Sequence, residues 1–294
     1  MPENPRRSPS LALTLVPAAS SVPRPRRLAE ASLRGVQGVL TDIDDTLTAD
    51  GALAPEAREA LQRLAEAGVP VFAVTGRPMG WSRPAAAGWP LQAVVAENGA
   101  VALWRPDAGR VDASTDADGL QVAYAQDEAT RAHNAERLRA VLARVLREVP
   151  GARAATDSAG RVTDIAIDHA EHAHLDAAQI AQVVALMREA GMTATVSSIH
   201  VNGWFGTHDK LSGARWIVRE RLGRTLDDEL ERWVYVGDST NDQVMFGHFP
   251  HSVGVANLMD FADRLHTWPA WLASAPRGRG FAEVAEKVLA ARAA

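Results

Sequence analysis

The sequence predicts an α/β fold, a doubly wound parallel sheet built from two separate stretches of chain with an inserted α+β domain between them. Three observations support this prediction. Short apolar runs each end in a polar cluster, which is typical of buried strands in a parallel sheet. Helical segments separate these runs, so that strand, helix and strand alternate. The middle of the chain instead combines long amphipathic helices with alternating strands.

Residues 36–106 are predicted to form the first core segment, and residues 204–294 the second. The first contains apolar runs at 39–42, 69–75 and 93–98, with a helix over 55–68 that begins at Pro55 and ends at Gly68. The second contains a helix at 211–222, followed by runs at 233–238 and 252–257. Both segments therefore contribute strands to one sheet.

Residues 107–203 are predicted to form the inserted domain. Apolar residues recur at helical spacing over 138–149 and again over 180–187. Two short alternating runs follow each of these helices. The resulting order, αββαββ, predicts a separate α+β layer.

Residues 1–35 are expected to be a disordered tail. The first 27 residues are rich in proline and carry five arginines against one glutamate, with no sustained apolar periodicity. The twin arginine Arg6-Arg7 leaves a targeting segment open as the alternative, although the apolar stretch 11–16 is short for an export signal.

Composition excludes several classes of function. The 294 residues are 47% hydrophobic and carry a net charge of −5, so we expect a folded protein that does not bind nucleic acid. The chain has no cysteine, which excludes disulfides, thiol nucleophiles and cysteine-ligated metals. No apolar run approaches about 18 residues. We therefore expect no membrane span, a cytoplasmic location, and a monomer or small homo-oligomer.

Carboxylates follow the first predicted strand, at the sheet edge where open parallel sheets bind ligands. Asp42 and Asp44 lie two residues apart, so an extended chain directs both to one face. Two carboxylates this close require a cation or a shared proton, and oxygen ligands favour a hard cation such as Mg²⁺. The alternative is that they cap backbone N–H groups of a loop.

Polar clusters end two further strands. Thr75 and Gly76 end the second, where a hydroxyl beside an open backbone can bind a phosphoryl oxygen, although a structural turn is the alternative. Asp238, Asn241 and Asp242 follow the run at 233–238. Their carboxylates would complete a divalent-cation site, or they cap the next helix.

Lysine is rare in this chain, since only two of the 31 cationic residues are lysines. Lys210 therefore suggests a position that needs a compact ammonium rather than a planar guanidinium, such as one between carboxylates and a phosphoryl group. Lys287 lies in the last predicted helix and is expected to be solvated.

Two weaker signals lie in the inserted domain. His169, His172 and His174 could bind a transition metal, but their position between a strand and a helix favours a solvated loop. His200 and Asn202 share one face of the last strand. They could face the substrate, and a core or hinge role is the alternative.

Together these elements resemble the haloacid dehalogenase (HAD) superfamily. The four motifs, in order, are Asp42-x-Asp44-x-Thr46, Thr75-Gly76-Arg77, Lys210, and Gly237-Asp238-x-x-Asn241-Asp242. The αββαββ insertion resembles the type IIB cap of the Cof-like, sucrose-phosphatase, trehalose-phosphatase and phosphomannomutase relatives, and the segment Ala96-Glu97-Asn98-Gly99-Ala100 resembles one common in that group. The resemblance implies a Rossmann-like core with a cap domain.

The resemblance also implies roles for individual residues. Asp42 would attack the substrate phosphorus and become an aspartyl phosphate, while Asp44 would protonate the leaving oxygen and later deprotonate water. Thr75, Gly76 and Lys210 would hold the phosphoryl group. Mg²⁺ would be bound by Asp42, the Asp44 carbonyl and Asp238, with Asp242 nearby and Asn241 in support. Two departures from the family pattern are Asp45 in place of glycine, and Leu211-Ser212-Gly213 after Lys210.

The predicted function is a Mg²⁺-dependent phosphatase of a small phosphorylated metabolite, in particular a sugar phosphate, with the cap closing over the site. Two alternatives stay open. One is a phosphosugar mutase or phosphotransferase, which would require a bisphosphate activator. The other is a non-catalytic module that binds a phosphometabolite.

Overall fold

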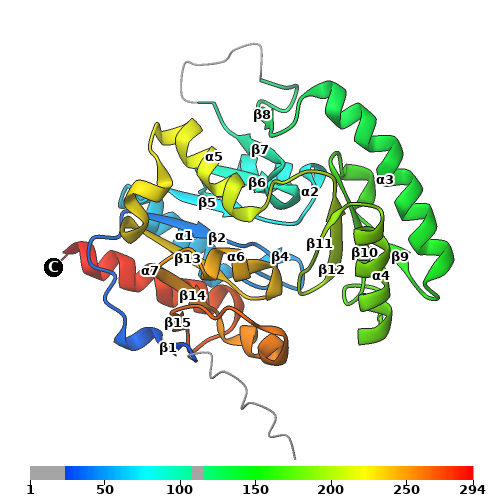
Figure 1. Cartoon of the computed structure of the whole chain (residues 1–294). Coiled ribbons are helices and arrows are strands. Elements are labelled where there is room, and N and C mark those ends of the chain that lie inside the picture. The colour runs from blue at the N-terminus through cyan, green and yellow to red at the C-terminus, as the bar shows by residue number, and fades with distance from the viewer. Residues whose placement is uncertain (1–23, 107–114, 294) are drawn as a thin grey trace, which may run out of the picture.

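The structure, a computed structural model, describes residues 24–106 and 115–293 and consists of a large sheet with helices on both faces and a smaller cap at one end (Figure 1). The predicted α/β fold class is confirmed. None of the described helices is both long and apolar enough to cross a membrane.

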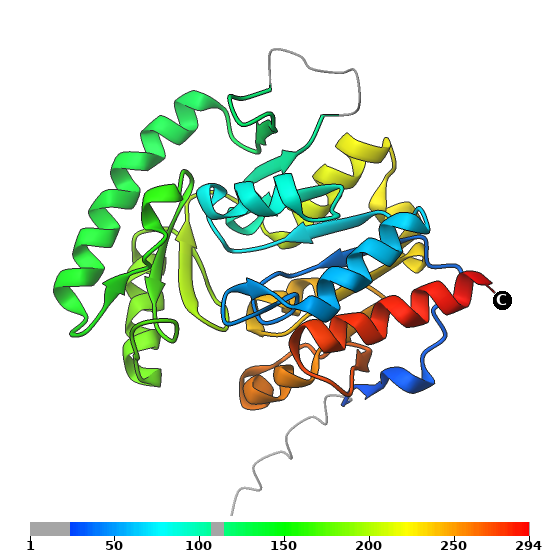
Figure 2. The ribbon, with the colours of Figure 1, turned by 180° about the vertical axis from the view of Figure 1, so that it is seen from behind.

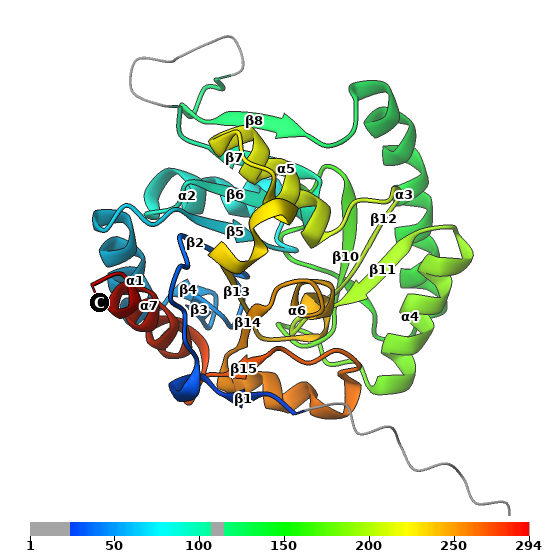
Figure 3. The ribbon, with the colours of Figure 1, turned by 60° about the vertical axis from the view of Figure 1, so that its left-hand side comes forward.

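The main sheet has nine strands in the order β1-β15-β14-β13-β2-β5-β6-β7-β8. In Figure 3, β8 lies at the top of this sheet and β1 at the bottom. The strands are β1 (Arg26–Arg27), β2 (Gly38–Thr41), β5 (Val71–Val74), β6 (Ala93–Ala96), β7 (Val101–Trp104), β8 (Gln121–Tyr124), β13 (Trp233–Gly237), β14 (His251–Gly254) and β15 (Trp271–Leu272). The pairs from β1 to β6 are parallel, whereas β7 and β8 return antiparallel.

Helices cover both faces of this sheet. One face carries α1 (Pro55–Glu66), α2 (Met79–Gly88) and α7 (Arg277–Ala293), and Figure 2 shows α1 and α7 side by side. The opposite face carries α5 (Lys210–Leu222) and α6 (Gln243–Phe246). Alternate residues of each strand point to opposite faces: Val39 packs in the first layer and Leu40 in the second. This double burial explains why the strands read as continuous apolar runs.

The strand order reverses around β2. Chain segments after β2 build the sheet outward through β5 and β6, and the chain then returns from the cap to place β13 and β14 on the other side of β2. The carboxyl ends of β2 and β13 meet at this reversal, because Thr41 is paired with Val236 in register. Such a point is where open α/β sheets bind ligands.

The cap contains α3 (Glu128–Glu148), β9 (Arg153–Ala154), β10 (Asp164–Asp168), α4 (Ala177–Glu189), β11 (Thr193–Val196) and β12 (His200–Trp204), in the predicted order αββαββ. Its four strands form an antiparallel sheet in the order β11-β12-β10-β9. Apolar residues of both helices, among them Val145 and Val183, pack on Ile167 and Val201 to form a separate core.

The structure corrects the predicted start of the inserted domain at residue 107. Strand β8 pairs with β7 in the main sheet, so the core extends to Tyr124 and the cap elements begin at Glu128. The antiparallel pair was missed because β7 follows β6 after a very short connection, the 3-10 turn Glu97–Gly99, which reads as the end of one strand.

The predicted tail is also too long. Residues 1–23 lie outside the described residues, but β1 pairs with β15, and Leu28 and Leu33 are buried in the core. The cation–π contact between Arg26 and the Trp271 ring further ties this segment to the sheet. Lys287 is not simply solvated, since its ammonium donates to the carbonyl oxygens of Ala29 and Ala31.

Candidate active site

Three aspartates and one lysine converge at the reversal point of the sheet. Carboxylate oxygens of Asp42, Asp238 and Asp242 lie within 4.8 Å of one another. The Nζ atom of Lys210 lies 3.0 Å from Asp42 and 2.7 Å from Asp242. All four side chains are buried. Segments far apart in the sequence thus bring the predicted residues of two carboxylate motifs and the lysine into one cluster.

The local backbone explains how Lys210 reaches this position. Lys210 is the first residue of α5, whose N-cap is Asp209; the Asp209 carboxylate accepts from the Ser212 N–H, and the Ser212 hydroxyl accepts from the Asp209 N–H. The departure Leu211-Ser212 from the family pattern thus supplies a capping box.

Two glycines allow this helix to approach the sheet. Gly99 has a φ of +109°, and a Cβ on it would lie 2.1 Å from the carbonyl oxygen of Asp209. A Cβ on Gly213 would lie 2.6 Å from the Gly99 Cα. The segment Ala96-Glu97-Asn98-Gly99-Ala100 therefore serves as the surface against which the N-terminus of α5 is packed.

Asp242 already uses both of its oxygens within the protein. One accepts from Lys210 and from the Tyr235 hydroxyl, and the other accepts from the N–H groups of Asp238 and Ser239. Asp242 therefore orders the loop after β13 and holds Lys210. Asn241, predicted as a supporting residue, accepts from the Ser239 hydroxyl in the same loop.

With all three carboxylates ionised, the cluster would carry more negative than positive charge, because only one ammonium faces them. Burial raises the pKa of Asp42 to about 7 against the opposing effect of Lys210. Burial, together with Asp242 and Asp42, raises the pKa of Asp238 well above its ordinary value. Burial opposes the charge of Lys210, but the two nearby carboxylates outweigh it and raise its pKa.

The donor set fits a divalent cation. The ligand atoms are oxygens, which suit a hard cation, and the excess negative charge would be neutralised by two positive charges. The hydrogen bonds that Asp238 accepts from Thr46 and Asn257 are both long, at 3.4 Å, so its oxygens remain weakly engaged. Asp42 and Asp238 are therefore better placed than Asp242 to offer ligand oxygens.

Asp44 points away from this cluster, toward Arg77. The Arg77 Nε lies 2.9 and 3.0 Å from the two Asp44 oxygens. Burial raises the pKa of Asp44, and the guanidinium opposes this shift. The side chain of Asp44 is thus not among the gathered carboxylates. The role that the resemblance implies for its backbone carbonyl stays a prediction.

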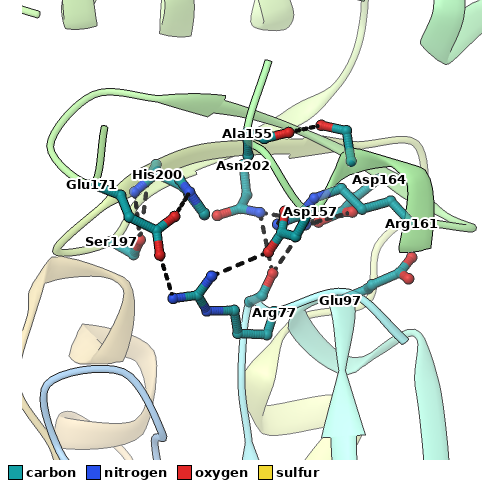
Figure 4. A network of polar contacts seen from close by, with 12 residues as sticks. Arg77, Glu97, Ala155, Asp157, Arg161, Asp164, Glu171, Ser197, His200 and Asn202 are labelled. Atoms are coloured by element: carbon teal, nitrogen blue, oxygen red, sulfur yellow. Dashed lines mark hydrogen bonds and ion pairs between the residues drawn. The ribbon is translucent and has the colours of Figure 1, made fainter. Parts of the chain in front are cut away.

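Arg77 also reaches the cap (Figure 4). Its two terminal nitrogens lie 3.2 Å from Asp157 and 2.8 Å from Glu171, and its side chain is 4% exposed. Thr75, the predicted phosphoryl ligand, is fully buried, and its hydroxyl accepts from the Arg77 N–H.

A buried polar network joins the core to the cap (Figure 4). The Gly76 carbonyl accepts from Arg161 at 3.0 Å and from Asn202 at 3.3 Å, and both side chains also bind Asp164. The Glu97 carboxylate accepts from the N–H groups of residues 162 and 163 of the cap. Gly76 thus acts here through its carbonyl, as an attachment point of the cap.

His200 is part of the same network. Its Nε2 lies 3.0 Å from Glu171, and both His200 and Asn202 are buried. Both side chains lie at the core–cap interface, where His200 contacts Glu171 and Asn202 donates to the Gly76 carbonyl and to Asp164.

A cavity of about 350 Å³ opens between the core and the cap next to Asp44. Its lining comprises Asp44, Asp45, Thr48, Asp50, Gly51, Arg77 and Arg277 from the core and Ala170, Glu171, His172 and Ile199 from the cap. Both arginines are engaged, since Arg277 Nε lies 3.0 Å from Asp45. Carboxylates therefore outnumber free cations around this space.

The histidine cluster forms a loop. The Asp168 carboxylate accepts from four successive N–H groups of residues 170–173, His169 contacts the Ser197 carbonyl, and His172 and His174 are exposed. Within residues 24–106 and 115–293, the aspartates at the sheet edge are the one group with the geometry to hold a metal.

Sequence reasoning missed four residues of the site: Arg77, Asp157, Glu171 and Tyr235. Arg77 stands inside the Thr75-Gly76-Arg77 motif, so its position alone could have suggested a role. The other three come from a turn, a loop and the interior of a strand, where no sequence pattern marks them.

Comparisons with known proteins agree with this geometry. Residues 39–127 match the haloacid dehalogenase-like hydrolase family. No curated protein matches the chain by sequence.

Many solved structures share the fold. The sucrose-phosphatase of Synechocystis sp., solved with sucrose and phosphate, is 17% identical, with a TM-score of 0.58 over 88% of this chain and 98% of its own. A haloacid dehalogenase-like hydrolase from Bacteroides thetaiotaomicron is 15% identical, with a TM-score of 0.58 over 86% and 99%. A Thermoplasma acidophilum protein is 16% identical, with a TM-score of 0.61 over 86% and 98%. Residues 39–127 are therefore similar to haloacid dehalogenase-like hydrolases, and the chain shares its fold with solved structures that include a sucrose-phosphatase and a haloacid dehalogenase-like hydrolase.

Proposed function

We propose that the protein is a Mg²⁺-dependent phosphatase that hydrolyses a small sugar phosphate through an aspartyl phosphate on Asp42. The observation that carries this proposal is the buried contact of Asp42 with Lys210 beside Asp238, at the reversal point of the sheet.

Asp42 would attack the phosphorus and expel the leaving oxygen, and water would then release phosphate from the acyl phosphate. Dividing the reaction in this way replaces one slow displacement by two easier ones. The transition state spreads negative charge over the phosphoryl oxygens, so positioned cations supply most of the stabilisation. Lys210 would bind these oxygens, together with the Thr75 hydroxyl and the backbone at Gly76.

Asp42, Asp238 and the backbone carbonyl of Asp44 would hold Mg²⁺, which neutralises phosphoryl charge when bound. Asp242 would remain near the ion while it holds Lys210 and the loop after β13. The excess negative charge of the cluster supports a divalent rather than a monovalent ion.

Asp44 would act on the leaving-group side. It lines the cavity, where its carboxyl group could donate a proton to the leaving oxygen and later accept one from water. The departing group would occupy the same cavity, between the core and the loop that contains Glu171.

The lining of this cavity favours a neutral leaving group. Its carboxylates can accept hydrogen bonds from hydroxyl groups, whereas Arg77 and Arg277 are already paired with carboxylates. A sugar offers many hydroxyls and no negative charge. The fold shared with a sucrose-phosphatase supports the same substrate class.

Replacement of Asp42 tests the proposal directly. Asp42→Asn removes the nucleophile, so Mg²⁺-dependent phosphate release from 4-nitrophenyl phosphate should fall by about 10³-fold or more. Asp263→Asn, which changes an exposed aspartate, is the matched control and should keep full activity. Mass spectrometry of the quenched wild-type enzyme should find phosphate on Asp42. Undiminished activity of Asp42→Asn would refute the proposed nucleophile, and turnover that begins only with an added bisphosphate would indicate a mutase.

A further inference from the structure

Arg77 connects the core to the cap through one buried guanidinium. Each of its three nitrogens has a carboxylate partner: Nε has Asp44, and the two terminal nitrogens have Asp157 and Glu171. Asp44 belongs to the core, whereas the other two carboxylates belong to the cap. Asp44 of the core and the two carboxylates of the cap therefore contact the same rigid, planar guanidinium group.

The base of the Arg77 side chain is fixed independently of these carboxylates. The Arg77 N–H donates to the Thr75 hydroxyl, and its carbonyl accepts from the Glu97 N–H. The guanidinium carbon lies 5.0 Å from the centre of the Trp81 ring. These contacts do not fix the orientation of the guanidinium plane. That orientation is determined by the three carboxylate partners.

The two cap carboxylates are themselves held by other cap residues. Arg161 lies 3.1 Å from Asp157, and His200 lies 3.0 Å from Glu171. Figure 4 shows the contacts that connect His200 of strand β12, through Glu171, to Arg77. The contact of Arg77 with Asp44 continues this series into the core. A guanidinium donates along fixed directions, so this arrangement transmits the placement of the cap to the Asp44 carboxylate.

We propose that Arg77 is a positioning residue that makes the orientation of Asp44 depend on the cap. Asp157 and Glu171 hold the guanidinium, and the guanidinium holds the Asp44 carboxyl toward the cavity where the leaving oxygen departs. Proton donation is thereby coupled to the docked position of the cap over the site. This inference rests on the proposed phosphatase function.

The test compares two substrates that differ in their need for a proton donor. 4-Nitrophenol leaves readily as an anion, whereas the alkoxide of glycerol 3-phosphate must be protonated as it leaves. A variant that misplaces Asp44 should therefore lose activity mainly on glycerol 3-phosphate. A variant that only disturbs folding or phosphate binding should lose activity equally on both.

We expect Glu171→Gln to lower kcat on glycerol 3-phosphate by about 10-fold, which is part of the rate increase that a general acid usually contributes. The kcat on 4-nitrophenyl phosphate should stay within about 2-fold of the wild-type value. Arg77→Lys keeps the charge without the planar fork and should show the same selectivity with a larger loss. The matched control is Glu189→Gln, which breaks an exposed ion pair with Arg144 in the cap and should change neither value. The Tm of each variant reports whether it is folded.

A double mutant separates positioning from other effects. In the Asp44→Asn background, Glu171→Gln should cause no further loss on glycerol 3-phosphate, because the group that it positions is absent. Equal losses on both substrates, or a full additional loss in that background, would overturn the proposal. Failure of the wild-type enzyme to hydrolyse either ester with Mg²⁺ would refute the phosphatase function itself, which is a distinct outcome.

Discussion

Two buried polar clusters lie next to each other in this protein, and they differ in how completely their charges are satisfied. At the sheet edge, three aspartates share one ammonium, and the oxygens of Asp238 accept only long hydrogen bonds. At the core–cap interface, each nitrogen of Arg77 has a carboxylate within 3.2 Å. The oxygens of Asp238 in the first cluster are weakly engaged, as the proposed cation site requires, whereas Arg77 in the second pairs all three of its nitrogens and joins the core to the cap.

The type of cation follows this difference. The compact ammonium of Lys210 stands in the cluster at the sheet edge, beside the position proposed for the phosphoryl group. The planar guanidinium group of Arg77 stands at the core–cap interface, where it is matched to three carboxylates at once. The cluster with weakly engaged oxygens is therefore the candidate ligand site, whereas the fully paired guanidinium of Arg77 joins the core to the cap.

The largest expected effect comes from removing the cation of the cluster at the sheet edge. Lys210→Met should lower kcat on 4-nitrophenyl phosphate by about 10²-fold or more, because the phosphoryl oxygens lose a positioned charge. It should also lower the free energy of unfolding without Mg²⁺ by about 3–5 kcal/mol, because three buried carboxylates then lack a counter-ion.

The control for this change is the other lysine of the chain. Lys287→Met removes contacts to two backbone carbonyls outside the site and should keep kcat unchanged. Thermal unfolding with and without Mg²⁺ completes the test, because added Mg²⁺ should raise the Tm of Lys210→Met more than that of the wild type. A fully active Lys210→Met would contradict the assignment of this cluster as a phosphate site.

A smaller effect is expected from the charge of the substrate. Glycerol 3-phosphate and 3-phosphoglycerate differ by one carboxylate in the leaving group, which would enter the carboxylate-rich cavity beside Glu171 and Asp44. We expect kcat/KM to favour glycerol 3-phosphate by about 10-fold, a difference of about 1.4 kcal/mol. The preference should shrink at high salt, which screens charge. Equal or reversed values would show that a cation in the cavity is available to the substrate.

The smallest expected effect is a change of thermal stability with pH that arises from Glu97 at the core–cap interface. Burial, and then the nearby Asp164, raise the pKa of Glu97 to about 7 in spite of the N–H donors around it. The folded protein thus holds this proton more tightly than the unfolded chain, so the stabilisation is present below about pH 4.5 and is lost as the pH rises through about 7.

The proton on Glu97 should therefore make the Tm fall by a few degrees as the pH rises from about 4.5 to about 7. In Glu97→Gln, the Tm should decline less over the same pH range. Glu220→Gln changes an exposed glutamate of α5 and serves as the control. Parallel curves for the wild type and Glu97→Gln would show that the proton on Glu97 does not contribute.

The sequence was sufficient to predict the features that depend on local pattern. The fold class, the αββαββ order and the strand-end position of Asp42 and Asp238 follow from apolar runs and their polar ends, which local chemistry determines. The convergence of Lys210 with these aspartates could be expected from the family resemblance.

The features that were missed depend on contacts between distant segments. The pairing of β1 with β15 and of β8 with β7 joins strands whose partners no local pattern specifies. The network of Arg77 with Asp157 and Glu171 depends on how the cap sits on the core. Side chains that are buried by one domain against another read, in the sequence, as ordinary surface charges.

The contact between Gly99 and Gly213 limits which residues the sequence can carry at these two positions. Helix α5 begins where two backbones touch, and a methyl group on either residue would push the start of the helix outward. Lys210 would then move with it, and its Nζ would retreat from Asp42. The distance between the Asp42 carboxylate and the Lys210 ammonium thus depends on the absence of a side chain at Gly99 and Gly213. A side chain at either glycine should therefore lower the proposed activity, although neither residue carries a reactive group.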